Sequence, residues 1–349
     1  CDGGCDCVEY EQKYCPGGWF FTFDGSPVPE YCFRTSGITH VSQRTEIIMN
    51  KDYFKLHFII FIWGFTAILG KLIEIPSIEL VFYRTGIAAV LLAMWFFFKK
   101  QLLLLKFRDI LPLLFTGTII AAHWIFFFLS ARVSTVSVCL AGMATVTLFT
   151  AFLEPLFFKR RISFLEIFSG LSVILGLYII FRFEFDHALG LSIALLSALL
   201  AAIFSILNAF YTKKHDPYAI TFYEMAGAAL SIAIFFIPYA YFEIAPNGEL
   251  QLNPTAMDWF YLLILSGVCT VYAFSVSVEI MKRLTPFTVN LAVNMEPIYG
   301  ILLALLIFGE SEKMSGEFYL GASLIIVTII INPLIRYQQK KGRIRVPKF

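Results

Sequence analysis

The chain has 349 residues, of which 58% are hydrophobic, 17% are aromatic and only 15% are charged. Soluble domains carry about a quarter charged residues, so this composition and a mean hydropathy of +0.76 argue against a soluble protein and favour a membrane protein. The formal net charge of +2 identifies no partner by itself, and no basic tract interleaved with aromatic residues indicates nucleic acid binding.

Residues 1–48 form a polar segment that holds five of the seven cysteines. The segment has no apolar run resembling a signal peptide, and Met49 looks like a natural start for the apolar part of the chain. We therefore expect residues 1–48 not to belong to the native membrane domain. A small disulfide or metal module is the alternative, although Cys5 and Cys7 are too close together for the usual CxxC metal site.

Apolar runs of membrane-spanning length succeed one another from residue 55 onward, and a span needs about 20 mostly apolar residues. The sequence predicts ten transmembrane helices, at 55–73, 78–98, 110–130, 134–157, 163–182, 189–211, 218–241, 258–281, 286–308 and 315–336. The fold class is therefore an all-α membrane protein. A basic tail at 339–349 comes after the last span.

The distribution of basic residues between successive connections orients the predicted spans. If the first span starts inside, the outer connections hold only Lys71, Arg132, Arg182 and Lys313, and most other Lys and Arg residues from Lys51 onward lie on the inner side. Inner connections of membrane proteins are enriched in Lys and Arg. We expect a multi-pass protein of the cytoplasmic (inner) membrane, with both termini of the membrane domain in the cytoplasm.

The membrane domain contains an internal repeat. FYRTGIAAVLL (82–92) resembles FYEMAGAALSI (222–232), and ARVSTVSV (131–138) parallels KRLTPFTV (282–289). This divides the chain into a first repeat at 49–187 and a second at 188–338. Each repeat has five predicted spans, an odd number, so the two repeats must cross the membrane in opposite senses. Inverted repeats of this kind are typical of secondary transporters, whose substrate site lies near the midplane between the halves.

The chain resembles the EamA type of the drug/metabolite transporter (DMT) superfamily over about residues 50–338. The resemblance rests on WGF at Trp63–Phe65, FYR in the second span, and the EP and FGE motifs, which start at Glu296 and end at Glu310 ahead of a last span with Gly321. The resemblance implies ten helices around a central cavity, alternating access, and transport of small metabolites. Amino acids or related compounds are the favoured substrates on this ground, and export is favoured over import.

One feature of the family pattern is missing from the first repeat. The resemblance implies a Pro in the fourth span where the ninth span has Pro297, but the corresponding stretch reads MATVTLFT (143–150). The Glu154-Pro155 pair falls nearer the inner surface and is not its equivalent. Whether both repeats share a kink is therefore open. Glu154 and Glu279 lie near the inner surface, where we expect them to be solvated or paired with basic residues.

Glu296 lies close to the membrane midplane, beside Pro297, in an otherwise apolar span. A charge at that depth costs at least about 2.5 kcal/mol, so Glu296 should face a protein interior or water instead of lipid. Pro297 should kink the helix, because it cannot donate a hydrogen bond to a carbonyl near Val293. Glu296 could then contact a cationic or amino group of a substrate or carry a coupling proton. A purely structural role is the alternative.

Arg84 and Glu224 occupy corresponding positions of the two repeats, each about 9 Å from its own membrane surface. Arg84 is a candidate for binding a substrate carboxylate or phosphate, and Glu224 for carrying a proton or contacting a cation. Structural roles are open for both, and the depths argue against a direct pair between them. The other cavity candidates are His123, Trp63, Trp124, Asn290, Asn294, Tyr272 and Tyr299. The alternative for His123 is a hydrogen-bonded histidine between helices, and for Trp63 and Trp124 it is packing.

No catalytic motif and no metal-ligand spacing is present in the sequence, so we expect neither enzymatic activity nor a metal or other cofactor. The expected partners are a small-molecule substrate, the lipid bilayer and a candidate coupling proton, in a monomer or a homodimer. The alternative function is a flippase or a transporter of lipid-linked or nucleotide-sugar-type substrates.

Overall fold

The computed structural model describes residues 51–340 except 101–104, 160–163, 184 and 243–248. The chain divides into two compact units, Cys1–Tyr53 and Phe54–Phe349, and the helix bundle belongs to the second. The predicted N-terminal segment at 1–48, most of the basic tail (341–349), and Arg160 and Arg161 lie outside the described residues.

The described part of the chain is helical and contains no strand. Eight helical segments are long and apolar enough to span a membrane: Lys51–Leu72, which ends in α2 (Thr66–Leu72), Ser77–Phe98 (α3), Phe107–Val133 (α4), Val136–Phe158, Ala188–Tyr211 (α8), Pro217–Tyr241 (α9), Ala256–Ile280 and Pro286–Glu312. Two more helices, α7 (Phe164–Phe183) and α14 (Gly316–Lys340), hold shorter apolar stretches. The protein is a multi-pass membrane protein, and the count of ten spans stays a prediction.

Local sequence fixes where several of these helices begin. Asp216 accepts hydrogen bonds from the amides of Tyr218 and Ala219 at the start of α9, and Pro217 takes the first helical position, where no amide hydrogen is needed. Thr255 and Asp258 cap each other's backbone amides at the start of α10 (Ala256–Ser266). Capping satisfies amides that would otherwise lack partners at the helix ends.

In two of the spanning segments the helix is interrupted at the same distance from its start. The first consists of α5 (Val136–Met143) and α6 (Val146–Phe158), and the second of α12 (Pro286–Val293) and α13 (Glu296–Phe308). In both, a helix of 8 residues is followed by one of 13 residues. Thr135 and Thr285 cap the two starts by accepting from the backbone amides of Val138 and Thr288. The repeat seen in the sequence is therefore also visible in the lengths of these helices.

The break in the first repeat forms without proline. The hydroxyl of Thr145 donates to the carbonyl of Gly142 at 2.8 Å, and its amide donates to the same carbonyl at 3.1 Å, which closes a tight turn. Threonine side chains compete with the helix for backbone partners in this way. In the second repeat Pro297 lies in the first turn of α13, so it comes after the break instead of kinking a continuous helix.

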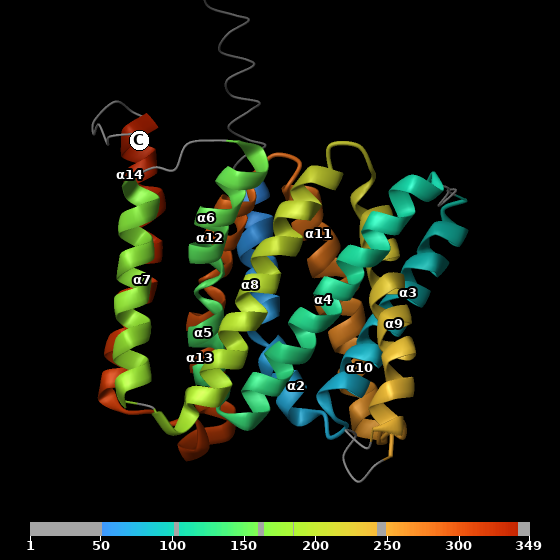
Figure 1. Cartoon of the computed structure of the whole chain (residues 1–349), viewed down its shortest axis with the longest axis horizontal. Coiled ribbons are helices and arrows are strands. Elements are labelled where there is room, and N and C mark those ends of the chain that lie inside the picture. Colours follow the sequence, from blue (N-terminus) through green and yellow to red (C-terminus); the bar gives the residue numbers. More distant parts are fainter. Residues whose placement is uncertain (1–50, 101–104, 160–163, 184, 243–248, 341–349) are drawn as a thin grey trace, which may run out of the picture. The chain divides into compact units, whose positions relative to one another are not determined.

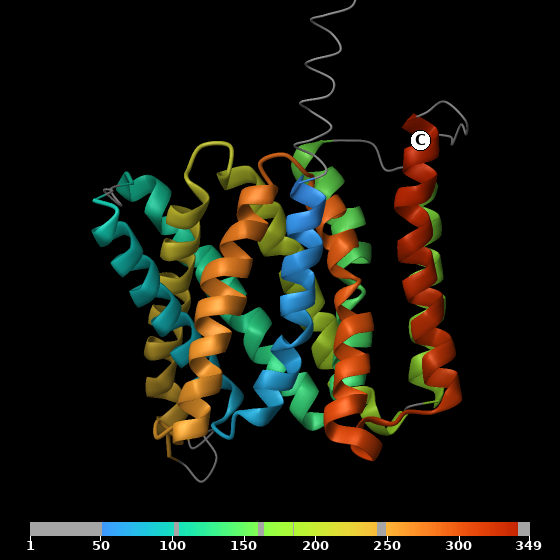
Figure 2. The same ribbon diagram turned by 180° about the vertical axis from the view of Figure 1, so that it is seen from behind.

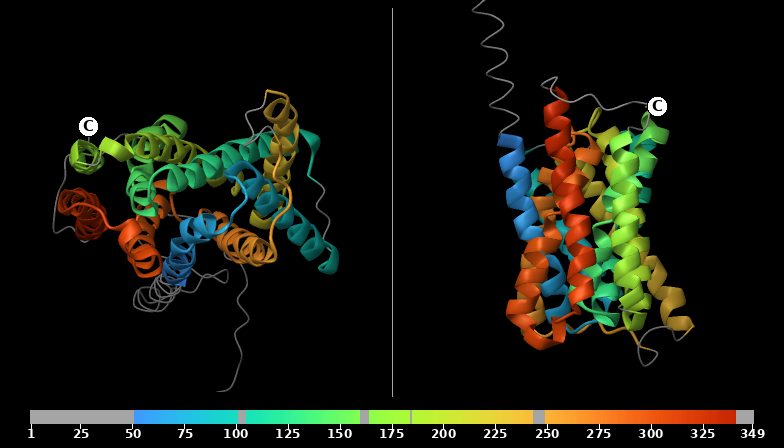
Figure 3. Two further views of the ribbon diagram at one scale, coloured as in Figure 1. Left: turned by 90° about the horizontal axis from the view of Figure 1, so that it is seen from below. Right: turned by 90° about the vertical axis from the view of Figure 1, so that its left-hand side faces the viewer.

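α4 lies at the centre of the bundle and packs against α8 and α9, and α3 packs on the other side of α9 (Figures 1 and 2). The contact between α4 and α9 is a backbone contact, because a Cβ atom on Gly117 would meet the carbonyl oxygen of Glu224, and one on Gly227 would meet the backbone of Leu114. α7 and α14 pair with each other at one edge of the bundle, as the end-on view in Figure 3 shows.

Candidate functional site

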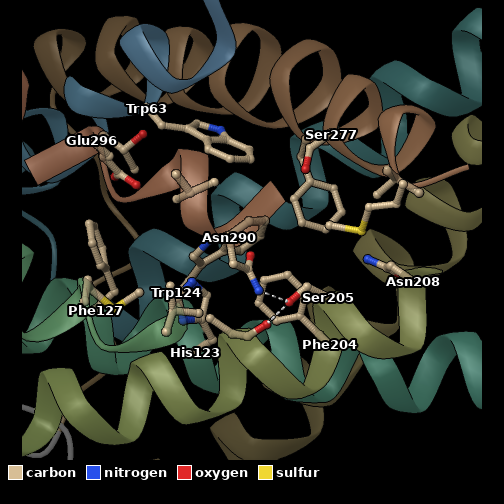
Figure 4. A pocket seen from close by; sticks show the side chains of 18 of the residues that line it. Trp63, His123, Trp124, Phe127, Phe204, Ser205, Asn208, Ser277, Asn290 and Glu296 are labelled. Carbon is tan, nitrogen blue, oxygen red and sulfur yellow. Dashed lines mark hydrogen bonds between the residues drawn. The ribbon is translucent and has the colours of Figure 1, made fainter. Parts of the chain in front are cut away.

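A cavity of about 90 Å³ lies inside the bundle, with room for several water molecules. Both halves of the chain line it (Figure 4). The first half supplies Trp63, Thr66, Arg84, His123, Trp124, Phe127, Met143 and Val146, and the second supplies Ala201, Phe204, Ser205, Asn208, Phe274, Ser277, Val278, Met281, Asn290, Val293 and Glu296. Six of the ten predicted candidates are among them.

Arg84 supplies a positive charge to the cavity wall. The residue is 1% exposed, its Nε donates to the hydroxyl of Thr270 at 2.8 Å, and its guanidinium lies 3.7 Å from the ring centre of Trp124. The Nη1 group is buried and has no hydrogen-bond partner in the described part of the chain. An unpaired buried donor on a charged group is costly, and arginine presents a planar fork that matches carboxylate and phosphate groups. The geometry therefore leaves Arg84 one donor group to offer to an anion.

Glu296 places a carboxyl group on the wall of the same cavity. It is the first residue of α13, directly after the break in the ninth predicted span, and its carboxylate points toward the cavity in Figure 4. The cavity thus presents a guanidinium group and a carboxyl group within walls that are otherwise largely aromatic and apolar.

A π-helical turn at Gly267–Tyr272 interrupts the segment between α10 and α11 (Ala273–Ile280). In this turn the indole nitrogen of Trp63 donates to the carbonyl of Cys269 at 3.0 Å, and the Thr270 hydroxyl that holds Arg84 donates in turn to the carbonyl of Leu265. Such turns free backbone carbonyls for other partners and often occur at functional sites. Here the turn positions two residues of the cavity wall.

His123 and Asn290 are both held by hydrogen bonds within the protein. The Nδ1 atom of His123 lies 2.8 Å from the hydroxyl of Ser197 and 3.0 Å from its carbonyl. The amide of Asn290 donates to the hydroxyls of Thr150 and Ser205, at 2.8 and 2.9 Å. These bonds fix the orientation of the two side chains that line the cavity.

Four predicted candidates do not line the cavity. Asn294 is buried and donates to the hydroxyl of Thr147, so it joins α6 to the break between α12 and α13. Tyr299 packs edge-on against Phe61, and Tyr272 is 43% exposed. Glu224 is fully buried and bonds to Asn208, which itself lines the cavity, at 3.4 Å. In the described part of the chain, Arg84 and Glu224 form no ion pair.

Sequence reasoning did not identify several polar residues of the cavity, among them Ser205, Asn208 and Ser277. Their residue types are common inside membrane helices, and no motif marks them. Asn208 and Ser205 lie three residues apart on α8, a spacing that places both on one helix face and was the available signal. Thr270, which holds Arg84, could not be found because the π-helical turn has no sequence signature.

Carboxylates from each broken span cap the other broken span, beyond the cavity. Glu312 is fully buried, accepts from the amides of Val136 and Ser137 at the start of α5, and pairs with Lys71 at 2.5 Å. Glu154 accepts from the amide of Phe287 at the start of α12, at 2.7 Å. Negative charge at a helix start is stabilising. Glu154 is 4% exposed, so the expectation that it is solvated is wrong, and its pairing with basic residues stays a prediction because Arg160 and Arg161 lie outside the described residues.

Glu279, in contrast, lies at the surface as expected. Its carboxylate pairs with Lys55 at 3.9 Å and with Arg283 at 3.6 Å. Among the residues that the structure describes, no three His, Cys, Asp or Glu side chains are arranged to hold a metal ion.

Comparison with known proteins gives a consistent result. The model of the EamA-like transporter family matches this chain twice, over residues 54–182 and 188–332. The chain is 22% identical over 286 residues to the uncharacterized transporter YxxF of Bacillus subtilis (strain 168), covering 80% of this chain and 88% of that protein. It is 24% identical over 194 residues to the uncharacterized transporter C22F8.04 of Schizosaccharomyces pombe (strain 972 / ATCC 24843), covering 55% and 50% of the two chains.

A solved crystal structure shares the fold. It aligns with a TM-score of 0.60 at 15% sequence identity and covers 82% of this chain and 98% of its own.

Proposed function

Because the chain belongs to the EamA-like transporter family of the DMT superfamily and is a membrane transporter of small solutes, we propose that it moves a small zwitterionic metabolite, an amino acid or a related compound, across the cytoplasmic membrane. Export is the favoured direction. The cavity between the two halves is the substrate site, and access to it alternates between the two sides of the membrane.

One observation carries this proposal: a cation with an unused donor and a carboxylate face the same buried cavity. Arg84 has a free Nη1 group for a substrate carboxylate, and Glu296 can accept from a substrate ammonium group. Buried charges need partners, and a zwitterion bound between the two would supply both. The aromatic side chains Trp63, Trp124 and Phe274 would cover its apolar part.

Alternating access is supported by the matching breaks in the two repeats. The family model matches twice, and α5 and α6 have the same lengths as α12 and α13. We infer ten spans in two inverted repeats, with α7 and α14 as the fifth and tenth. Broken helices at the midplane place half-helix ends at the substrate in many secondary transporters.

The proposed orientation rests on the basic residues. Lys213 and Lys214 after α8, and Lys282 and Arg283 after α11, belong to connections at the end of the bundle where Lys51–Leu72 begins, which is at the top of Figure 1. We propose that this basic end is cytoplasmic, together with both termini of the membrane domain.

The test is counterflow in proteoliposomes with a labelled panel of amino acids and related metabolites. The wild type should show saturable exchange of at least one compound, and Glu296→Gln should reduce it by about tenfold or more, because a charge-assisted hydrogen bond contributes roughly 1.5–3 kcal/mol. Glu310→Gln is the matched control, since Glu310 is an exposed carboxylate that pairs only with Lys313 in the described part of the chain.

Three results bear on the proposal differently. Equal exchange in wild type and Glu296→Gln would keep the transporter and remove Glu296 from its site. A loss in Glu310→Gln of the same size would show that the effect is not specific to the cavity. No exchange by folded wild-type protein would contradict the zwitterion proposal, and lipid-linked substrates would then be tested.

A further inference from the structure

Glu224 is a buried carboxylate that the proposed substrate site does not use. It lies on α9, about 10 Å from the start of that helix, and is fully buried. Its Oε2 atom accepts a hydrogen bond from the amide of Asn208 at 3.4 Å. Its Oε1 atom is buried and has no hydrogen-bond partner in the described part of the chain.

Glu224 has no counter-charge among the described residues of the helices packed against it. α9 packs against α3, α4 and α11, and Asn208 comes from α8. Arg108 of α4 is exposed. The other titratable groups of these helices have partners elsewhere: Glu79 with the amide of Gln251, Tyr83 with the carbonyl of Leu252, Arg84 with Thr270, Asp109 with His215, His123 with Ser197, Arg132 with the carbonyls of Gly70 and Ile73, Tyr211 with Thr116, and Glu279 with Lys55 and Arg283.

Two buried oxygen atoms, one on Glu224 and one on Asn208, lack a hydrogen-bond donor among the described residues. Besides Oε1 of Glu224, the Oδ1 atom of Asn208 is also buried without a partner among the described residues. Both atoms are acceptors when the carboxylate is ionised, so neither can satisfy the other. A proton on Glu224 turns one oxygen into a donor and removes the buried negative charge, which would otherwise cost several kcal/mol. The surroundings therefore fit a protonated carboxyl group.

Asn208 connects Glu224 to the substrate cavity. Its side chain lines the cavity, and Figure 4 shows it at the cavity wall near Ser277. The helix that carries Glu224, α9, is held against α4 by the backbone contact at Gly117 and Gly227. Because that contact is tight, a movement of α8, which carries Asn208, is the change that would bring the carboxyl group of Glu224 into contact with cavity water.

We propose that Glu224 is the proton-binding site that couples substrate movement to a proton gradient, with Asn208 as the group that separates it from the cavity. This proposal rests on the proposed function for its substrate and adds the coupling ion. The proton is taken from water on one side of the membrane when the cavity opens there. It is released to water on the other side after the halves have changed position.

The first experiment needs no substrate. Infrared spectra of the reconstituted protein are recorded while the pH is raised, for wild type, Glu224→Gln and Glu296→Gln. The wild type should show a C=O stretching band of protonated carboxyl groups that disappears at high pH. Glu224→Gln should lose a component of this band that Glu296→Gln keeps. A spectrum of Glu224→Gln identical to that of the wild type would overturn the proposal, whatever the substrate is.

The second experiment uses the amino-acid panel in proteoliposomes with a pH gradient. One pH unit can sustain an accumulation of about tenfold for one proton exchanged per substrate. The wild type should approach this ratio, whereas Glu224→Gln should accumulate nothing, and any exchange that it retains should not depend on pH. Undiminished accumulation by Glu224→Gln would overturn the proposal.

A conservative variant separates proton binding from folding. Glu224→Asp keeps a carboxyl group and should retain accumulation with a displaced pH profile, while the exposed control Glu310→Gln should match the wild type. If Glu224→Asp and Glu224→Gln fail equally although both elute as folded protein, Glu224 is structural and the proposal is wrong. A wild type that transports no panel compound would contradict the proposed function, and the infrared result would still decide the role of Glu224.

Discussion

At the scale of single residues, the guanidinium of Arg84 has three features that a lysine side chain could not reproduce together. Its Nε is bound to Thr270, its plane stacks on Trp124, and its Nη1 is left over for a ligand. A lysine would keep the charge but has neither the planar fork nor the stacking surface. The arrangement therefore favours recognition of a carboxylate by shape as well as by charge.

We predict that Arg84→Lys weakens the apparent substrate affinity by about tenfold or more, because a charge-assisted hydrogen bond of roughly 1.5–3 kcal/mol loses its geometry. The concentration dependence of counterflow measures this affinity. Arg283→Lys is the matched control, since Arg283 pairs with Glu279 at the surface. An unchanged affinity in Arg84→Lys would mean that Arg84 acts as a structural clamp.

Much of the residue-scale site can be predicted from the sequence by one argument. A charged side chain deep in an apolar span must find a protein or water environment, so Arg84, Glu224 and Glu296 stand out from the sequence alone. The argument gives depth but not rotation about the helix axis. It therefore could not tell that Glu296 lines the cavity whereas Glu224 lies behind Asn208.

At the scale of helices, the two broken spans are held by reciprocal caps. Glu312 lies beyond α13 and caps α5, and Glu154 lies near the end of α6 and caps α12. Each broken span thus contacts the start of the other through a buried carboxylate. The sequence predicted a kink at Pro297, which lies just after one break, but not the break at Ala144 and Thr145, because a threonine turn has no signal as strong as proline.

We predict that Glu312→Ala destabilises the protein by about 1–3 kcal/mol, the usual effect of leaving buried hydrogen-bond donors without their acceptor. The change leaves Lys71 and the amides of Val136 and Ser137 without their shared acceptor. Unfolding in detergent, followed by circular dichroism, measures the loss. Glu310→Ala, two residues away and exposed, should have little effect, and equal stability of the two variants would contradict the cap.

At the scale of the whole membrane domain, the cavity is closed at one end. The side chain of Arg132 donates to the carbonyls of Gly70 and Ile73, Glu312 pairs with Lys71, and Phe128 is fully buried beyond the last lining residue of α4. These contacts join segments at the end of the bundle opposite the start of Lys51–Leu72 (Figure 1).

At the opposite, basic end the Glu154 carboxylate caps α12, but the cavity lining comes closer to the helix ends. The cavity lining reaches Asn208 on α8 and Met281 after α11, close to the ends of those helices. Of the contacts at this end, the Lys55–Glu279 pair joins partly exposed side chains at 3.9 Å, and such pairs contribute at most about 1 kcal/mol. In the described residues, the barrier toward the basic end is therefore the thinner one.

We predict that a cysteine at position 277 reacts with a membrane-impermeant thiol reagent from the basic end only. The background protein has its seven cysteines replaced, so Ser277→Cys carries the single thiol. Ser275→Cys is the matched control, because Ser275 lies on the same helix, is fully buried and does not line the cavity.

If the basic end is cytoplasmic, labelling of Ser277→Cys occurs in inside-out vesicles and is slow in right-side-out vesicles. Substrate bound beside position 277 should slow the labelling in inside-out vesicles. Faster labelling from the outer side would reverse either the orientation or the assignment of the closed end. A single cysteine at the exposed position Lys214, in the connection after α8, reports the orientation by itself and tells these two explanations apart.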